Sequence, residues 1–341
     1  METNIQTQYQ GKQSISFRNP VYIEGFASIV GSKEGQGPLR QYFDIVSEDD
    51  KFGQKTWEDA ECFMQKKALE MAAQKAGIAA GDIRMIFAGD LLAQSMASSF
   101  GIGELKRPMY GLFGACSTMG ESLSLASMAV AAGYGDHIAA VTSSHFATAE
   151  KEFRFPLAYG NQRPLSASWT VTGSGGCIVG KKKTAIKVTG VTTGKIMDYG
   201  LKDSQNMGAC MAPAAFDTIY QNLVDFGRKP KDYDKIITGD LGLVGQQILI
   251  DFMNQKGMVI SAVHDDCGIW IYDGDSQNTH AGGSGCGCSA TVLMAYILPK
   301  IAVGEWKRVL FVPTGALMSK VSFYEGNSVP GIAQAVVLEH A

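Results

Sequence analysis

Cys116 is the residue whose surroundings most favour chemistry. In the segment GLFGACSTMGESLSLASMAVAAG, residues 111–133, a strand ends, glycines form a tight turn, and Cys116 opens a helix. A helix N-terminus carries partial positive charge and unsatisfied N–H groups, which stabilise a thiolate or an acyl oxyanion. The sequence therefore predicts a lowered pKa for Cys116 and a role as nucleophile or anion-binding group. A buried structural cysteine at a turn is the alternative that the residues leave open.

Two histidines are candidates to act together with Cys116. His145 lies in TSSHF, directly after the strand predicted at residues 138–142, and α/β proteins keep their sites at the carboxyl ends of strands. His280 begins the glycine-rich stretch HAGGSGCGCSA, which turns into a second helix. Taken alone, His280 fits a capped turn as well as it fits a functional group.

The elements that must position these residues alternate between strand and helix. Strands are predicted at residues 20–30, 83–88, 109–113, 137–143, 171–179, 186–192, 235–238, 309–312 and 332–338. Helices are predicted at residues 57–76, 91–101, 116–132, 214–226, 245–256 and 290–301. This alternation indicates βαβ units with parallel or mixed sheets. The small residues along 116–132 predict a helix that packs closely in the middle of the protein.

The second half of the chain repeats the order of the first. The string IFAGDL at residues 86–91 matches IITGDL at 236–241, and GACS at 114–117 resembles GCSA at 287–290. The strand that closes the first half, at 172–180, has a counterpart at 330–338. We therefore expect two duplicated α/β halves, residues 1–183 and 184–341, that share a central layer of helices.

Composition argues against several classes of protein. The 341 residues include 40 glycines, are 45% hydrophobic and 18% charged, and carry a formal net charge of −3. These values do not fit a disordered chain, and a mixed surface without net positive charge does not favour nucleic acid as a partner. The sequence predicts no membrane span, and its polar first residues predict no signal peptide. Seven cysteines without a paired Cys-x-x-Cys or histidine pattern predict mostly reduced thiols and no metal site.

Five strings carry a resemblance to known proteins. They are GACSTMGESLSLASM, SSHFATAEKEFRFPLAYGNQRP, WTVTGSGGCIVG, TGDLGLVG and AGGSGCGCSA. Together with the helix-opening Cys116, the His280 turn and the duplication, they resemble the thiolase and β-ketoacyl synthase fold. Within that superfamily, residues 17–341 resemble the stage V sporulation protein AD (SpoVAD) family of spore-forming bacteria. The resemblance implies a thiolase-like α/β fold with five layers in the order αβαβα.

The SpoVAD resemblance implies a binding protein and not an enzyme. The family is taken to bind dipicolinic acid and to belong to the SpoVA apparatus, which moves dipicolinate, usually with calcium, across the membrane around the forespore. The implied partners are dipicolinic acid and other SpoVA proteins, with no cofactor of the chain's own. The implied location is the forespore or spore inner membrane, with peripheral attachment through partners. Thiolase-like proteins also suggest a homodimer.

Departures from the thiolase-like enzymes point in the same direction. The resemblance places Cys116 at the nucleophile position and His280 at the histidine of the glycine-rich turn. Where condensing enzymes carry His or Asn at a strand end of the second half, this chain has Asp240, whose charge would oppose a thiolate. The late Cys-x-Gly of thiolases is replaced by PTGA at residues 313–316. The catalytic set is therefore incomplete, and no catalytic residue is assigned.

A dipicolinate site needs cationic or N–H donors for two carboxylates and a flat surface for the pyridine ring. The segment EKEFRFPLAYGNQRP, residues 150–164, contains several such donors, and arginine suits bidentate recognition of a carboxylate. A lid or dimer-edge loop with Arg–Glu pairs is the alternative interpretation of this segment. We expect the former acyl pocket to bind dipicolinate, with these candidate ligand-binding residues: Cys116, His145, Arg154, Asn161, Arg163, Asp240 and His280.

Two other functions stay open on the sequence alone. Cys116 would still suffice for a simpler acyl transfer. The chain would also serve as a scaffold that binds neither ligand and only holds the membrane subunits of the SpoVA apparatus together.

Overall fold

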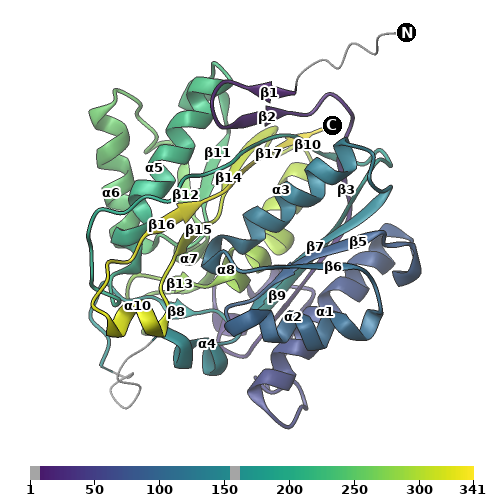
Figure 1. The fold of residues 1–341 in the computed structure, drawn as a ribbon, viewed down its shortest axis with the longest axis horizontal. Helices are drawn as coiled ribbons and strands as arrows, with labels where there is room; N and C mark the ends of the chain where they lie inside the picture. Colours follow the sequence, from purple (N-terminus) through teal and green to yellow (C-terminus); the bar gives the residue numbers. More distant parts are fainter. Residues whose placement is uncertain (1–7, 154–161) are drawn as a thin grey trace.

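A mixed sheet of thirteen strands runs through both halves of the molecule, with helices on both of its faces (Figure 1). The computed structural model describes residues 8–153 and 162–341. Five strands of the first half lie in the order β6 (Met109–Leu112), β5 (Met85–Gly89), β7 (His137–Ser144), β9 (Gly173–Gly180) and β3 (Tyr22–Val30). The first three are parallel to one another, and β9 is antiparallel to both of its neighbours.

The second half repeats this arrangement strand for strand. Its order is β12 (His264–Asp266), β11 (Lys235–Thr238), β14 (Arg308–Val312), β17 (Ala335–His340) and β10 (Ile186–Thr192). Again the first three are parallel, and the fourth is antiparallel to both neighbours. One order and one set of orientations that occur twice are what the duplication of an α/β unit produces. The boundary between residues 183 and 184 stays a prediction.

The two half-sheets are joined edge to edge through β3 and β10, the last strands in the two orders given above. Lys187 of β10 pairs with Tyr22 of β3 in antiparallel register. Beside this junction, β2 (Ser14–Ser16) also pairs with β10, and β1 (Tyr9–Gln10) pairs with β2. At the other end of β3, the short strand β4 (Ile45–Val46) runs parallel to it.

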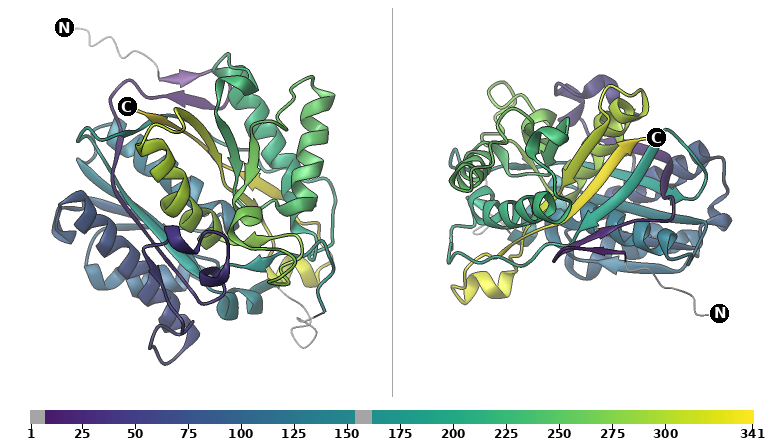
Figure 2. Two further views of the ribbon diagram at one scale, coloured as in Figure 1. Left: turned by 180° about the vertical axis from the view of Figure 1, so that it is seen from behind. Right: turned by 90° about the horizontal axis from the view of Figure 1, so that it is seen from above.

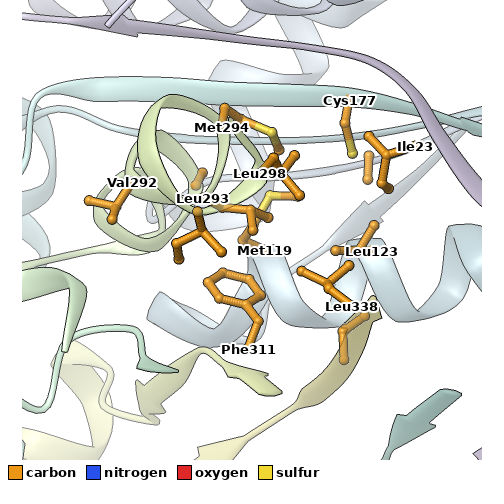
Figure 3. Close-up of a cluster of buried hydrophobic side chains, with 14 of the residues drawn as sticks. Ile23, Met119, Leu123, Cys177, Val292, Leu293, Met294, Leu298, Phe311 and Leu338 are labelled. Atoms are coloured by element: carbon orange, nitrogen blue, oxygen red, sulfur yellow. The ribbon is translucent and has the colours of Figure 1, made fainter. Parts of the chain in front are cut away.

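Two helical segments lie between the half-sheets and form the central layer. One is α3 (Thr118–Ala131), and the other is α8 (Cys286–Val292), which continues through a π-helical turn, Leu293–Ile297, into α9 (Leu298–Ala302). The core around them contains side chains from both helical segments and both half-sheets (Figure 3), among them Met119, Leu123, Cys177, Leu293, Leu298, Phe311 and Leu338. The central helices are therefore buried, as the small residues of 116–132 predict.

The outer faces of the half-sheets carry separate pairs of helices. Helix α1 (Trp57–Ala76) packs on the first half-sheet and against α2 (Met96–Gly101), whereas α5 (Met207–Asp225) and α6 (Gly242–Gln255) cover the second. Figure 2 shows the two pairs on opposite sides of the molecule. Helix pair, half-sheet, central helices, half-sheet and helix pair make the five layers, so the predicted thiolase-like fold class is confirmed.

Short elements surround the N-terminal ends of the central helices. They are α4 (Phe146–Phe153), α7 (Cys267–Ile271), α10 (Lys320–Tyr324), β8 (Trp169–Thr170), β13 (Gly283–Ser284), β15 (Thr314–Ala316) and β16 (Gly331–Ala333). Strand β8 pairs with β13, and β15 pairs with β16. Within the described residues, none of the helices combines the length and the apolar character needed to cross a membrane.

Most predicted elements are present, and the differences lie at their boundaries. Helix α1 has the predicted bounds because Thr56 accepts the Asp59 N–H and Gly77 ends the helix in the left-handed conformation. Helix α5 begins well before the predicted residue 214, because Asn206 caps it and Pro213 is accommodated inside it. The second central helix begins at Cys286 and not at residue 290.

Candidate functional site

Cys116 lies on the turn between β6 and α3, where the central layer begins. The turn is a short 3-10 helix, Ala115–Ser117, in which Ala115 has a φ of +51°. The Ser117 hydroxyl donates to the Gly114 carbonyl at 2.7 Å and holds the turn in place. The side chain of Cys116 is almost entirely buried, with 8% of its residue surface exposed. Ala115 adopts a backbone conformation that few residues other than glycine favour.

Asp240 of the second half meets Cys116 of the first. The Asp240 carboxylate accepts a hydrogen bond from the Thr314 hydroxyl at 2.8 Å and one from the Gly285 N–H at 3.0 Å. It is also hydrogen-bonded to the Cys116 thiol. Burial raises the pKa of Asp240 to about 7, although these three hydrogen bonds favour its ionised form. Two of the predicted residues are therefore brought together, from opposite halves of the chain.

The Cys116 thiol differs from the sequence-based prediction. Burial first, and then the negative charge of Asp240, raise its pKa well above the usual value of a cysteine, and only the Gly285 N–H acts in the other direction. The predicted lowering of this pKa is wrong, because desolvation and a neighbouring carboxyl group outweigh the partial charge of the helix terminus. At neutral pH Cys116 is therefore a neutral hydrogen-bond donor and not a thiolate.

A cavity of about 540 Å³ opens beside Cys116. Both halves of the chain contribute to its wall, which is mainly apolar. The lining residues are Leu91, Ala93, Phe113, Ala115, Cys116, Glu152, Phe153, Met207, Ser284, Ala316, Leu317, Met318, Ser319, Lys320, Val321 and Ser322. Such a volume and lining suit a small, largely flat or apolar organic ligand.

Two opposite charges stand at the wall of this cavity. Glu152 of α4 and Lys320 of α10 form an ion pair with an N–O distance of 3.2 Å. Helix α10 has no buried residue, and Ser319 caps it by accepting the Ser322 N–H at 3.1 Å. A pair this exposed contributes about 1 kcal/mol or less to stability. Lys320 can therefore exchange Glu152 for a charged ligand at small cost.

His145 lies in a different environment from Cys116. Its Nε2 is 2.9 Å from the Asp50 carbonyl, its Nδ1 accepts the Ala147 N–H at 3.1 Å, and its ring packs 5.4 Å from that of Trp57. Burial lowers the pKa of His145. The residue does not line the cavity. The structure therefore places it as a buried, hydrogen-bonded residue that fixes the start of α4.

His280 and Arg163 lie together, but outside the lining of the Cys116 cavity. The two ring nitrogens of His280 are each 2.9 Å from an oxygen, one on Pro164 and one on the Asn278 side chain. Arg163 donates to the Asn278 carbonyl at 2.7 Å. Both residues thus hold one turn to the segment after residue 161. Arg154 and Asn161 lie outside the described residues.

Several residues at the cavity were not among the predicted site residues. Lys320 and Glu152 supply its charge, and Thr314 and Gly285 hold Asp240. Thr314 belongs to the PTGA string, which stands where thiolases carry their late Cys-x-Gly motif. That replacement was a signal in the sequence that this position is unusual. Gly285 has a φ of +102°, which the glycine-rich stretch after His280 permits. No local pattern around Lys320 identifies it, because only the folding of the chain brings this residue to the cavity wall.

The surroundings of Cys116 differ from those that nucleophilic catalysis by a cysteine requires. Acyl transfer through a cysteine requires a thiolate or an adjacent base that removes the thiol proton. Neither His145 nor His280 lines the cavity, and the group that is hydrogen-bonded to the thiol is the carboxyl of Asp240. A carboxyl with a pKa of about 7 is present in both protonation states near neutral pH, so it both donates and accepts hydrogen bonds there.

Solved structures with the same fold include a 3-oxoacyl-[acyl-carrier-protein] synthase, an OleA protein and a thiolase. A 3-oxoacyl-[acyl-carrier-protein] synthase III from Aquifex aeolicus covers 94% of this chain and 100% of its own, with a TM-score of 0.59 and 14% identity. An OleA variant from Xanthomonas campestris covers 95% and 97%, with a TM-score of 0.62 and 14% identity. The Acat5 thiolase from Ascaris suum covers 95% and 100%, with a TM-score of 0.56 and 11% identity. At such identities the likeness shows the fold alone.

Sequence comparison gives a closer relationship. The family model of stage V sporulation protein AD (SpoVAD) matches residues 11–339. A protein named stage V sporulation protein AD from Bacillus subtilis (strain 168) is 42% identical over 331 residues, which are 97% of this chain and 98% of that protein. The match spans both halves of the fold, and so includes Cys116 and Asp240 alike. The chain therefore belongs to the stage V sporulation protein AD family.

Proposed function

We propose that this chain binds dipicolinic acid in the cavity beside Cys116, as a non-catalytic component of the SpoVA system that serves dipicolinate uptake into the developing spore. One observation carries the proposal. The catalytic cysteine position of the fold is occupied by a neutral thiol hydrogen-bonded to an acid, at a cavity large enough for a small aromatic ligand. Membership of the SpoVAD family supports the sporulation role.

The chemistry of the cavity matches that of dipicolinate. The ligand is a flat pyridine ring with a carboxylate on each side of the ring nitrogen. Phe113, Phe153 and Met207 offer apolar surface for the ring. Lys320 offers a positive charge to one carboxylate. When Asp240 is protonated, its hydroxyl can donate to the Cys116 sulfur, which leaves the thiol hydrogen as a donor to the other carboxylate. Calcium would enter together with the ligand carboxylates.

The partners and the location follow from the same proposal. Other SpoVA proteins would hold the chain at the forespore or spore inner membrane, as a peripheral component that presents dipicolinate to them. Peripheral attachment agrees with the described helices, none of which has the character of a membrane span. A homodimer is proposed only by analogy with thiolase-like proteins.

Calorimetric titration of the purified chain with dipicolinate, with and without calcium, tests the proposal. We expect binding to weaken about 10-fold or more in Lys320→Gln and in Cys116→Ala, because each variant removes a donor to a charged ligand. Lys300→Gln is the matched control, since Lys300 also forms an exposed ion pair, with Glu305, but does not line the cavity. Unchanged affinity in both cavity variants would place the ligand elsewhere.

Two other outcomes would replace the proposal with another function. A flat titration with the folded wild-type chain, with and without calcium, would favour a scaffold. Incubation with acyl-CoA or acyl-carrier substrates, followed by mass spectrometry of the Cys116 peptide, tests for acyl transfer. An acyl adduct that turns over would show an enzyme.

A further inference from the structure

The two central helices end on the side of the molecule opposite the Cys116 cavity. Helix α3 leads through Tyr134 into β7, and α9 leads through Val303 into β14. Both turns expose apolar surface, since Tyr134 is 69% exposed and Val303 is 77% exposed. The cavity lies at the other ends of the same helical segments, where Cys116 and Ser284 line it.

A run of three exposed lysines lies beside the Tyr134 turn. Residues 181–183, all lysines, connect β9 to β10. Lys181 forms an ion pair with Asp136, which belongs to the same turn as Tyr134, at an N–O distance of 2.8 Å. The next lysine donates its backbone N–H to the buried carboxylate of Glu24, also at 2.8 Å. The lysine run is therefore fixed next to the end of α3.

The C-terminal strand joins this lysine run to the end of α9. The Ala341 N–H donates to the carbonyl of Ala185, which follows the lysines, at 3.0 Å. His340 donates its N–H to the Lys307 carbonyl at 3.0 Å, and its Nδ1 is 2.8 Å from the Ile301 carbonyl. The left view of Figure 2 shows the C-terminus beside the end of α9. These contacts define one continuous area, which we call the helix-end surface and which comprises Tyr134, Lys182, Lys183, Val303, Trp306 and Lys307.

Trp306 extends the helix-end surface into a cluster of aromatic rings. Its ring centroid lies 5.9 Å from that of Tyr296 and 6.2 Å from that of Trp270. Tyr42, which is 40% exposed, lies 5.0 Å from Tyr296. Trp270, Tyr296 and Trp306 pack against the core and remain partly exposed. Tryptophan and tyrosine are the side chains that favour the interface between a membrane and water.

The helix-end surface carries an excess of positive charge. Acidic side chains beside it have partners of their own, which are as follows: Asp136 with Lys181, Glu24 with His137, Glu305 with Lys300, Glu339 with Arg228 and Arg308, and Asp234 with the backbone N–H groups of Lys307 and Arg308. Asp234 offsets the charge of Lys307. Within residues 8–153 and 162–341, however, neither Lys182 nor Lys183 takes part in an ion pair. Because the whole chain has a formal net charge of −3, this excess is a local property.

We propose that the helix-end surface docks directly onto an anionic lipid bilayer. Lys182 and Lys183 contact the lipid phosphates, while Val303, Tyr134 and Trp306 reach the boundary between headgroups and acyl chains. Charge attraction and apolar insertion together are what stable peripheral attachment requires. Nucleic acid offers the negative charge but no apolar layer for these side chains, and so fits the surface less well.

This lipid contact adds to the attachment through SpoVA partners and does not depend on dipicolinate binding. It involves the C-terminal ends of the central helices, so the cavity at their N-terminal ends stays uncovered. The described helices include no membrane span, which agrees with docking at the surface of the bilayer.

Co-sedimentation of the full chain with lipid vesicles tests the proposal. We expect binding to vesicles of phosphatidylcholine with phosphatidylglycerol, about 10-fold or more weaker binding to phosphatidylcholine alone, and a loss of affinity as salt is added. Lys182→Glu and Lys183→Glu together should weaken binding about 10-fold or more, because each lysine near an anionic surface contributes about 1 kcal/mol. Val303→Glu should weaken it about 3-fold or more, since a carboxylate replaces the inserted side chain.

Two matched controls lie at the other end of the strands. Lys55→Glu changes an exposed lysine just before α1, and Leu243→Glu changes a side chain that is 56% exposed in the first turn of α6. Neither should change vesicle binding. All of these substitutions are at exposed positions, so we expect the variants to fold.

Fluorescence quenching by brominated lipids locates the contact. Replacing Trp57, Trp169 and Trp270 by Phe leaves Trp306 as the single tryptophan, and anionic vesicles with brominated acyl chains should quench its emission. A protein that keeps only Trp57 is the control, because Trp57 is 37% exposed but lies outside the helix-end surface, and it should not be quenched.

Three results would overturn the proposal. They are no binding of the wild-type chain to anionic vesicles, binding that neither the double lysine variant nor Val303→Glu weakens, and equal quenching of Trp57 and Trp306. The first result would leave the helix-end surface to a protein partner. None of these results bears on the dipicolinate titration, which tests the cavity separately.

Discussion

Asp90 and Asp240 hold equivalent places in the two halves, yet they have different surroundings. Each follows the second strand of its half, β5 or β11, within the matching strings IFAGDL and IITGDL. Asp90 accepts the N–H of Leu92 at 2.9 Å, the N–H of Ser98 at 2.8 Å and the Ser98 hydroxyl at 2.7 Å. All of these donors lie within eight residues of it along the chain. Asp90 thus closes a local turn.

The donors of Asp240 come from distant segments. The N–H of Gly285 is 45 residues away along the chain, and the hydroxyl of Thr314 is 74 residues away. Its third partner, Cys116, belongs to the other half and lines the cavity. Duplication thus supplied the same carboxyl group to both halves. Asp90 holds a local loop, whereas Asp240 lies against Cys116 at the wall of the cavity.

Removal of each carboxyl should expose this difference most strongly. We expect Asp90→Ala to lower the free energy of unfolding by about 4 kcal/mol, because three buried donors lose their acceptor at once. Asp240→Ala should lower it by about 2 kcal/mol or less, since one of its three donors, Cys116, lines the cavity and can bond to water there. Urea denaturation measures both values. The control is Asp136→Ala, whose exposed pair with Lys181 should change stability by less than about 1 kcal/mol. Equal losses at positions 90 and 240 would contradict the comparison.

The pH dependence of stability should also distinguish Asp240. Its pKa is raised to about 7 in the folded chain, so the folded state retains a proton that the unfolded state has already released above about pH 4. Stability from this group therefore falls as the pH rises from about 4 to 7 and is constant above that range. Asp240→Asn should reduce the slope in this window by up to about 1.4 kcal/mol per pH unit. Unfolding free energies at pH 5, 6, 7 and 8 measure it, and an unchanged slope would argue against a buried, protonated Asp240.

The smallest expected effect concerns the reactivity of Cys116. Because burial and Asp240 raise the thiol pKa, alkylation by iodoacetamide at pH 8 should be about 10-fold or more slower than that of a free cysteine. Asp240→Asn removes the negative charge and should speed the reaction a few-fold. Peptide mapping by mass spectrometry measures the rates. Cys62, which lies away from Asp240, is the internal control. A thiol that reacts rapidly in the wild-type chain would restore the lowered pKa predicted from the helix terminus.

Sequence patterns predicted the fold well because they report on local physics. Strand and helix periods, the Thr56 cap and the two GDL strings correctly indicate a duplicated α/β chain. Boundaries were less predictable where tertiary contacts override a local signal, as at Pro213 inside α5. The family strings were long enough to identify SpoVAD from the sequence.

The site was predictable only in part, because its parts meet through the fold. Cys116 and Asp240 were both named, and the structure brings them together. His145 and His280 are directed at backbone oxygens instead, which no spacing along the chain reveals. The sign of the Cys116 pKa shift could not be predicted either. It depends on burial and on a carboxyl of the other half, whereas only the helix terminus is visible in the sequence.

The shared central layer also restricts how this protein can move. Opening the molecule between its halves would separate α3 from α8 and from β17 of the second half-sheet, and would break the pairing between β3 and β10. A ligand in the cavity therefore cannot signal by swinging one half against the other, as hinged binding proteins do. Displacement of Glu152 from Lys320 would instead loosen α10, a surface helix with no buried residue. Ligand binding would thus be detected by a neighbouring protein as a local loss of order in α10, on a molecule that otherwise stays rigid.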